Sequence, residues 1–526
     1  MAPKPGENPA KKSVLWAVLG TVLKGLWTAF VVLTPVLGAW VASSLAAHAN
    51  GPIALSAASG LLAFPILPLL WEAWVETGRR KKKNVKPHIL TFLDRLVLRT
   101  LAVNILFLGI LLGTQPKAAF AALSTRGDWM LDKSSGESAQ TVRKKLFWAA
   151  DRLEWLYLAF HDNPFDQKDD LPNPTGSSTA GDKPVNTGTV PSPTPTAGTT
   201  ASNGSTDKPT QDKPTQDKPT QNDPGQTSPA NREFATTKWP PPLPKALHFV
   251  VADMPRDAET SIRAVAEYIA QRESDPAGRF RAAHDWVADR IAYDGPSYVA
   301  HKYPPQDAET VFRTRTGVCA GYSKLLAALG RALGLEVEYV VGDARGSGDS
   351  EQGESHAWNA VKIGDQYYLA DATWNSGYLN GSTFTKNFRT DYLFTPPHVF
   401  GLDHFPNLTK WQLRSTPITR GDFFRQAMMT PRFYAEGREL LSPTRSQVTV
   451  SGPFTAEIKT PPGLFTLASW TVFGQPQRTH CETENGTTAR VTCNLPAKGK
   501  YTVMLFSSEK QYGQFDYIGQ FEANRE

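Results

Sequence analysis

Cysteine is scarce in this chain, with 3 in 526 residues. That number excludes a disulfide-dense scaffold and argues against a protein with several zinc sites. Hydrophobic residues are slightly sparse at 40%, although a chain of this length can still bury at least one large core. The net charge is only +6, so its meaning depends on where the charges lie. Length alone predicts two or three domains.

Three long apolar runs occupy the beginning of the chain. They cover residues 25–47, 53–71 and 96–112, and each is near the ~20 residues with which a helix crosses a bilayer. Prolines inside such runs are tolerated in membrane helices. The third run is the shortest and contains Arg99, so it is the weakest of the three. The pattern predicts a multi-pass membrane anchor with three transmembrane helices in residues 1–115.

Basic residues set the expected orientation of this anchor. The link between the second and third runs carries six of them: Arg79, Arg80, Lys81, Lys82, Lys83 and Lys86. By the positive-inside rule, this link and the N-terminus are cytoplasmic, and three spans then place everything after Gln115 outside. The six charges equal the net charge of +6, so the rest of the chain is formally neutral. The net positive charge therefore reports how the anchor is oriented in the membrane, and nucleic acid is not an expected partner.

Two polar segments follow the anchor. Residues 116–165 include apolar positions at helical spacing from about Gln140 to His161. They predict an amphipathic helix, either near the outer membrane face or packed on the membrane bundle. Residues 166–238 are rich in Pro, Thr, Ser and Gly and contain three tandem copies of Asp-Lys-Pro-Thr-Gln. Such a composition cannot bury enough apolar surface to fold, so we predict a disordered linker that tethers a folded domain.

The nucleophile candidate lies in the next domain, residues 239–425. Cys319 precedes a strongly helical run over 323–333, with Gly334 as its stop and Thr316 as the predicted N-cap. The first turn of a helix carries unpaired N–H groups and the positive end of the dipole, which stabilise a thiolate. A lone cysteine at a helix start is commonly inert, so a catalytic role requires a base nearby.

A predicted hairpin supplies that base. Residues 355–363 and 366–373 are expected to form two strands around a turn at Gly364-Asp365. In this register His356 and Asp371 share one face as diagonal neighbours, roughly 5–8 Å apart at Cβ. An aspartate that orients an imidazole, which in turn activates a cysteine, is the logic of a catalytic triad.

These residues lie in motifs of a known family. Gly-Val-Cys-Ala-Gly-Tyr at 317–322, His-Ala-Trp-Asn at 356–359 and Asp-Ala-Thr-Trp at 371–374 together resemble the transglutaminase-like superfamily. The stretch from His404 to Leu413 is similar to its kyphoscoliosis-peptidase and cytokinesis-protein branch. The resemblance covers about residues 260–526. It implies a papain-like α+β fold in which Cys319 is the nucleophile, His356 the general base and acid, and Asp371 the orienting acid.

The resemblance also bears on oxyanion stabilisation and on calcium. A papain-like oxyanion site would use the N–H of Cys319 and an upstream donor. Gln306 is a candidate for that donor, with helix capping as an equal alternative. The calcium sites of the animal enzymes require loops of acidic ligands, and no such loop is visible in this sequence. We therefore expect no metal and no other cofactor.

The last hundred residues change character again. Short β-rich runs separated by turn residues predict an immunoglobulin-like β-sandwich in residues 426–526, which packs on the catalytic domain or presents substrate to it. The predicted strands are 448–450, 454–459, 465–472, 490–494 and 501–506. Cys481 and Cys493 flank the turn signal Asn485-Gly486, so they could face each other in a hairpin and form a disulfide. A disulfide suits an oxidising compartment, and two free thiols are the alternative.

The sequence thus predicts a multi-domain protein with an N-terminal helical membrane anchor, a papain-like α+β transglutaminase-like domain and a C-terminal β-sandwich. The expected function is that of a membrane-anchored cysteine enzyme acting on amide bonds of proteins or peptides outside the cytoplasm. Hydrolysis by a peptidase or deamidase and protein cross-linking share the same triad, so both stay open. The alternative is a non-catalytic scaffold of the same fold that binds cell-envelope proteins.

Overall fold

The computed structural model describes residues 9–49, 53–81, 89–132, 134, 136–159, 163–166, 246–346 and 353–526. Nearly all of the predicted linker lies outside these residues, so its disorder stays a prediction. Part of the basic link also lies outside them, namely Lys82, Lys83 and Lys86.

The N-terminal region is helical. Its elements are α1 (Pro9–His48), α2 (Ile53–Leu61), η1 (Leu62–Ile66), α3 (Leu67–Arg80) and α4 (Phe92–Thr114). Three stretches of the described residues are long and apolar enough to cross a membrane, at Leu19–His48, Ala54–Arg80 and Phe92–Thr114. These stretches agree with the three runs read from the sequence.

Arg99, the residue that weakened the prediction of the third span, has a partner. Its guanidinium pairs with Glu72 of α3, and Arg95 Nη2 lies 2.7 Å from Glu72 Oε1. Ionisable side chains are tolerated within membrane helices when they pair with one another. The ion pairs therefore make Arg99 compatible with a membrane-spanning α4.

The segment after α4 forms several short helices. They are α5 (Pro116–Arg126), η2 (Trp129–Leu131), α6 (Glu137–Asp151) and α7 (Glu154–Ala159). The continuous helix expected from about Gln140 to His161 is thus divided after Asp151. Leu123 and Ala150 form a buried cluster with Val41 of α1. The segment therefore packs on the helices of the N-terminal region.

A group of helices precedes the central sheet. They are α9 (Phe249–Ala252), η3 (Arg256–Ala258), α10 (Ile262–Ala270), α11 (Pro276–Arg290), α12 (Gly295–Ala300), α13 (Ala308–Thr314) and α14 (Cys319–Ala332). A short parallel pair, β1 (Ala292–Tyr293) with β2 (Thr316–Gly317), lies among them. Tyr322, Leu325 and Leu329 on one face of α14 are fully buried in the main core with Trp286 of α11. The helical spacing of these apolar residues thus produces a core helix.

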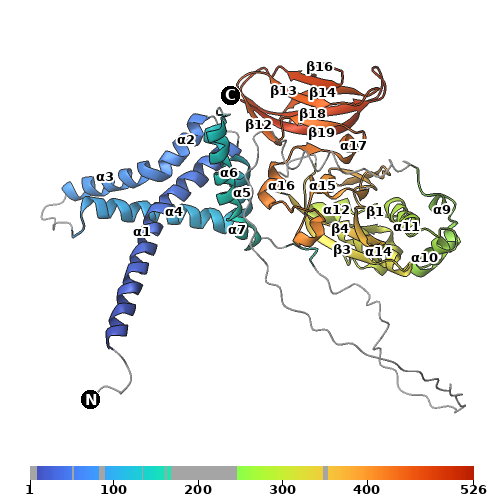
Figure 1. Cartoon of the computed structure of the whole chain (residues 1–526), viewed down its shortest axis with the longest axis horizontal. Helices are drawn as coiled ribbons and strands as arrows, with labels where there is room; N and C mark the ends of the chain where they lie inside the picture. Colours follow the sequence, from blue (N-terminus) through green and yellow to red (C-terminus); the bar gives the residue numbers. More distant parts are fainter. Residues whose placement is uncertain are drawn as a thin grey trace, which may run out of the picture. The chain divides into compact units, whose positions relative to one another are not determined.

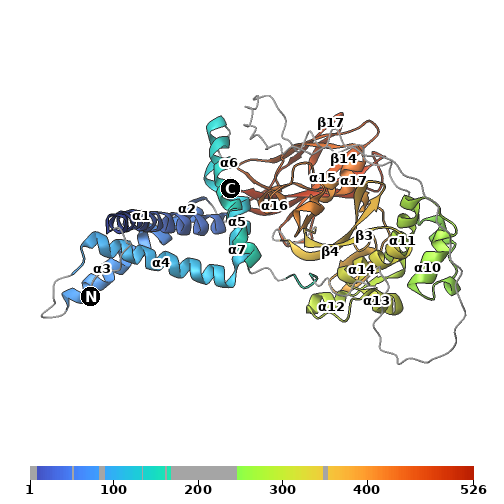
Figure 2. The same cartoon turned by 60° about the horizontal axis from the view of Figure 1, so that its bottom comes forward.

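The central sheet has the antiparallel order β8-β5-β4-β3-β9. Its strands are β3 (Val337–Ala344), β4 (Glu354–Ile363), β5 (Gln366–Ala370), β8 (Leu393–Thr395) and β9 (His404–Pro406). The surrounding short elements are β6 (Gly377–Asn380), β7 (Thr383–Lys386), α15 (Pro397–Phe400), η4 (Thr409–Gln412) and α16 (Arg420–Arg425). Helix α14 lies against β3 and β4 in both views (Figures 1 and 2).

The β4–β5 hairpin has the predicted register, since Ile363 pairs with Gln366. The returning strand is shorter than predicted and ends at Ala370. Its ladder stops there because the N–H of Asp371 donates to the carbonyl of Tyr392 at 2.8 Å, outside the hairpin. Asp371 therefore lies just beyond the strand, where side chains no longer have to alternate between the two faces of the sheet.

The C-terminal residues form two antiparallel sheets with one added parallel strand. One sheet has the order β11-β13-β17-β16, and the other has the order β10-β19-β18-β14-β15 with β12 along β19. The elements are β10 (Met428–Met429), α17 (Pro431–Ala435), β11 (Glu439–Ser442), β12 (Gln447–Val450), β13 (Phe454–Lys459), β14 (Phe465–Val472), β15 (Thr479–His480), β16 (Glu482–Glu484), β17 (Thr488–Cys493), β18 (Gly499–Ser508) and β19 (Asp516–Arg525). Sequence analysis missed β19, which has a single β-branched residue, Ile518.

Cys481 and Cys493 are joined by a disulfide with a Cα–Cα separation of 4.5 Å. They close the β16–β17 hairpin, in which Glu482 pairs with Thr492. Asn485 in the turn exchanges two hydrogen bonds with the backbone of Thr466 in β14. The hairpin is therefore fixed at both of its ends.

Candidate active site

Cys319 is the first residue of α14 and is 1% exposed. The N-cap position belongs to Val318, so the prediction that Thr316 caps this helix is wrong. Thr316 lies in β2 instead. The side chain of Gln306 performs the capping contact, since its Oε1 accepts the N–H of Val318 at 2.9 Å. An upstream loop, rather than the adjoining residues, thus holds the start of the helix.

The glycine that follows Cys319 by two positions permits this contact. A Cβ atom added to Gly321 would lie 2.5 Å from Gln306 Oε1 and 2.8 Å from a methyl carbon of Val311. At both distances the neighbouring atom would have to move, so a side chain here would displace the Gln306 amide from its contact with Val318. The Gly-x-Cys-x-Gly spacing therefore lets the Gln306 loop approach the helix start. Gln306 Nε2 meanwhile donates to the carbonyl of Pro304 at 3.0 Å.

Hydrogen bonds fix α14 against β4. The hydroxyl of Ser323 lies 2.9 Å from the carbonyl oxygens of both Cys319 and Ala357. Asn359 Nδ2 donates to the carbonyl of Ser323 at 2.9 Å. Ala357 and Asn359 belong to the strand that carries His356, so these bonds hold the nucleophile candidate at a fixed position relative to the imidazole.

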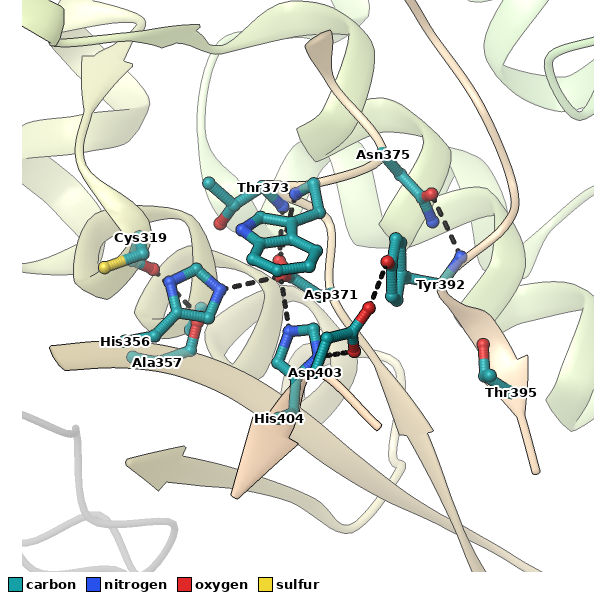
Figure 3. Close-up of polar contacts among 12 residues, drawn as sticks. Cys319, His356, Ala357, Asp371, Thr373, Asn375, Tyr392, Thr395, Asp403 and His404 are labelled. Carbon is teal, nitrogen blue, oxygen red and sulfur yellow. Dashed lines mark hydrogen bonds and ion pairs between the residues drawn. The ribbon is translucent and has the colours of Figure 1, made fainter. Parts of the chain in front are cut away.

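His356 and Asp371 form a direct pair. His356 Nε2 lies 2.7 Å from Asp371 Oδ2, and both side chains are buried. The other carboxylate oxygen, Oδ1, accepts the N–H groups of Thr373 at 2.7 Å and Trp374 at 3.2 Å. Figure 3 shows the sulfur of Cys319 beside the imidazole, on the side away from Asp371. The three residues predicted as a triad therefore come together in the order that proton transfer requires.

The network continues past Asp371 (Figure 3). His404 Nε2 lies 3.2 Å from the same Oδ2 atom, and His404 Nδ1 lies 2.7 Å from Asp403 Oδ1. The hydroxyl of Tyr392 donates to the second oxygen of Asp403 at 2.5 Å. Asp371 thus accepts from two imidazoles and two backbone groups, so its carboxylate is fully satisfied while buried.

Aromatic rings enclose the second histidine. The ring centroid of His404 lies 4.1 Å from that of Phe400, 4.5 Å from that of Trp374 and 5.1 Å from that of Trp358. Trp374 also contacts the ring of His356, at 5.5 Å. Packing therefore restricts both imidazoles to the orientation in which they bind Asp371.

The charges of this cluster shift its ionisation. Burial opposes a charged His356, but the negative charges of Asp371 and Cys319 outweigh it and raise the pKa of His356 to about 9. The pKa of His404 is likewise raised to about 9, because Asp403 and Asp371 outweigh its burial. Burial opposes ionisation of Asp371, yet the two histidines hold the pKa of its carboxyl well below its usual range. The site therefore favours imidazolium next to carboxylate.

These shifts predict a pH dependence of stability. Both histidines bind protons more tightly in the folded protein, at a pKa of about 9, than at their ordinary value of 6.5. Their contribution is complete below pH about 6.5 and is lost as the pH rises through about 9. We expect the thermal midpoint of the full chain in detergent to fall over this window, and less so in His404→Gln. A thermal midpoint that stays constant or rises between pH about 6.5 and about 9 would contradict the raised pKa values of His356 and His404.

His356, Asp371 and His404 are also a group whose ligand atoms lie within 4.8 Å of one another, a spacing that suits a metal ion. Their nitrogen atoms already meet the Asp371 oxygen at hydrogen-bond distances. An ion bound there would replace the protons that these bonds require. The donor set therefore fits a proton-transfer network better than a resident metal.

A cavity of about 460 Å³ opens beside His356. Its lining includes both acidic and basic side chains, such as Glu354 and Arg389, and the C-terminal region contributes Met428 and Tyr517. The volume is within the range of ligand-binding sites. Residues of both the central-sheet region and the C-terminal sheets thus form the wall of this cavity.

Sequence reasoning missed His404 as part of the site. The residue was noted in a family motif, but neither its contact with Asp371 nor those of Asp403 and Tyr392 was expected. His404 lies on β9, which pairs with β3 on the far side of β4 from β5. No local spacing links it to Asp371, so the sequence carries no geometric signal of this contact.

Comparison with known proteins identifies the region around the triad. Residues 263–372, which include all three triad candidates, match the family model of the transglutaminase-like superfamily. These residues form a transglutaminase-like domain. The prediction of the superfamily is thereby confirmed.

The relatives also confirm the predicted branch. The chain is 31% identical to mouse kyphoscoliosis peptidase over 203 residues, which are 37% of this chain and 31% of the mouse protein. It is 32% identical to human kyphoscoliosis peptidase over 192 residues, 34% of this chain and 29% of the human protein. The chain thus spans about a third of the length of these curated relatives. A solved structure described as a TGase aligns with 25% of this chain and 35% of its own, at 20% identity and a TM-score of 0.20.

Proposed function

We propose that this protein is a membrane-anchored cysteine enzyme that transfers acyl groups from amide bonds of proteins or peptides outside the cytoplasm. The observation that carries the proposal is the pair His356–Asp371 at 2.7 Å, directly beside the N-terminal residue of α14, Cys319. The transglutaminase-like domain supports protein substrates, since enzymes of this superfamily commonly act on them.

The reaction proceeds through a thioester. The Cys319 thiolate attacks the amide carbonyl carbon, forming a C–S bond, and His356 gives its proton to the nitrogen as the C–N bond breaks. In the second step an incoming nucleophile attacks the thioester carbonyl carbon and gives its proton to His356. The new bond to carbon forms as the C–S bond breaks, and Cys319 leaves as the thiolate. Water yields a carboxylate, as in a peptidase or deamidase, whereas a lysine amine yields a cross-link.

The oxyanion of the tetrahedral intermediate requires a preorganised donor. The backbone N–H of Cys319, at the start of α14, is our candidate. The Oε1 atom of Gln306 accepts from Val318 and one Nε2 hydrogen is donated to Pro304, so donation to an oxyanion would fall to the second Nε2 hydrogen. Its contacts therefore favour the helix-capping alternative, in which Gln306 acts by positioning the N-terminus of α14.

The proposed architecture is a papain-like catalytic domain followed by an immunoglobulin-like β-sandwich. Helix α14 against the β3–β4 pair supports the first part, because it joins the nucleophile to the base. The two C-terminal sheets, which share one buried core, support the second. The disulfide between Cys481 and Cys493 suits the oxidising side of a membrane and agrees with the orientation derived from the basic link.

Topology gives a prediction of its own. A reporter that is active only outside the cytoplasm, fused after Glu526, should be active, because three spans place the C-terminus opposite the basic link. The matched control carries the reporter fused after Arg80, on the cytoplasmic side. A silent reporter after Glu526 together with an active one after Arg80 would reverse the orientation.

The decisive experiment identifies products. The full chain in detergent is incubated with an envelope-protein extract, and mass spectrometry scores cleaved, deamidated and cross-linked peptides against a Cys319→Ser control. One product class should appear with the wild type and be absent from the control. The scaffold alternative predicts a different result. In that case neither the wild type nor Cys319→Ser yields products, and a His356→Ala variant supports cellular function as well as the wild type does.

A further inference from the structure

A short segment far from the triad in sequence lies against Cys319. It is Asn-Pro-Phe-Asp at 163–166, which ends at the first residue of the predicted linker. Phe165 is only 5% exposed and belongs to one buried cluster with Cys319 and Ala357. Pro164 and Asp166 on either side of it are exposed. Asn163 is buried as well, at 7% exposed, so the segment inserts an aromatic ring and one polar side chain into the domain.

Tyrosines line the pocket that receives this ring. The centroids of Phe165 and Tyr303 are 5.3 Å apart, and Tyr293 and Tyr298 pack against the same cluster. The hydroxyl of Tyr339 donates to the carbonyl of Phe165 at 2.8 Å. Because Tyr293 and Tyr298 also line the cavity beside His356, the pocket and that cavity share a wall.

The remaining contacts of the segment involve main-chain groups. Asn163 Nδ2 donates to the carbonyl of Gly342 in β3 at 3.1 Å. Asn163 Oδ1 accepts the N–H of Phe165 at 3.0 Å, which holds the segment in a turn. An aromatic side chain in an apolar pocket, with its own carbonyl on a tyrosine hydroxyl, is a contact that many peptides can make. The segment therefore binds as a short peptide ligand would.

We propose that this tyrosine-lined pocket is the subsite for an aromatic side chain of the substrate, and that Phe165 occupies it in the resting protein. The inference rests on the proposed function, in which Cys319 is the nucleophile. Cys319 is 1% exposed and shares its buried cluster with Phe165. In this proposal, departure of the segment opens the path by which an amide carbonyl reaches the sulfur. A protein or peptide with Phe or Tyr at the matching position competes with Phe165, so the same contact restrains the enzyme and selects its substrate.

The test measures how fast Cys319 is modified. The full chain in detergent is treated with iodoacetamide, and mass spectrometry follows alkylation of the Cys319 peptide with time. Phe165→Ala should accelerate alkylation at least about tenfold, because it removes the occupant of the pocket. Asn163→Ala, which loses the bond to Gly342 and the turn, should accelerate it by less. Tyr512→Ala, which removes an aromatic ring that is 87% exposed, should match the wild type.

A peptide then tests the pocket itself. Acetyl-Asn-Pro-Phe-Asp-amide should slow the alkylation of Phe165→Ala towards the wild-type rate, and the same peptide with alanine for phenylalanine should not. Thermal unfolding shows whether each variant is folded. If Phe165→Ala does not fold, the alkylation rate of Cys319 in Asn163→Ala tests the proposal instead.

The outcomes separate the two proposals. Equal alkylation rates for the wild type, Phe165→Ala and Asn163→Ala would overturn the occupied subsite and leave Cys319 as the nucleophile. If Cys319 resists alkylation in all folded variants and reacts only in denaturant, the nucleophile assignment fails, and the subsite with it. Acceleration without an effect of the phenylalanine peptide would overturn the aromatic selectivity.

Discussion

Cys319→Ser should abolish covalent labelling by a thiol-directed amide-mimic probe and reduce product formation by at least roughly 10³-fold. The physical reason is that a serine hydroxyl keeps its proton and cannot replace a sulfur nucleophile in the attack on the probe or on an amide carbonyl. Labelling reports on one site because Cys319 is the free cysteine of the chain and the other two are bonded to each other.

A double variant provides the matched control for this result. Replacing Cys481 and Cys493 together by serine removes the disulfide but leaves the triad, so labelling at Cys319 should persist. Undiminished labelling of Cys319→Ser, or loss of labelling in a folded double variant, would contradict the assignment of the nucleophile.

Asp371→Asn should lower activity by about 10⁴-fold, the scale seen when the orienting acid of a triad is replaced. The carboxylate holds His356 and His404 at one oxygen, and the pKa of each histidine is raised partly by its charge. A neutral amide removes that charge and presents a donor where the imidazole needs an acceptor. The pH profile of activity should change as well, because the charge of Asp371 contributes to the raised pKa of His356.

Asp403→Asn is the matched control at the other end of the network. Asp403 contacts His404 and Tyr392, and its link to the base runs through His404 and Asp371. We expect a loss within roughly tenfold, since an asparagine oxygen retains one of the two contacts. Equal losses in the two folded variants would show that Asp371 has no special role as the orienting acid.

Several features of the fold follow from local sequence. The apolar runs of the anchor, the helix that starts at Cys319 and the hairpin that carries His356 are each encoded by the residues that form them. Gly364 takes the positive φ of 63° that the hairpin turn requires, and Gly334 takes one of 78° after α14. Strands β13 and β14 begin and end at the residues predicted from their alternation.

Other features depend on contacts between distant segments. Thr316 looked like an N-cap because its residue type suits that role, yet Gln306 reaches the helix start from another loop. Arg99 is unsuited to a membrane helix by its own charge, but in the structure it forms an ion pair with Glu72 of α3. In both cases a tertiary partner supplied what the local sequence lacked.

The sequence by itself determined which residues could do chemistry: a cysteine at a helix start, and a histidine and an aspartate on a hairpin with an evident register. Only the tertiary structure decided what surrounds them. His404 reaches Asp371 from β9, and Phe165 enters the pocket beside Cys319 from a segment before the linker. Neither contact has a periodicity that reveals it, because each joins segments whose proximity depends on the packing of the whole domain.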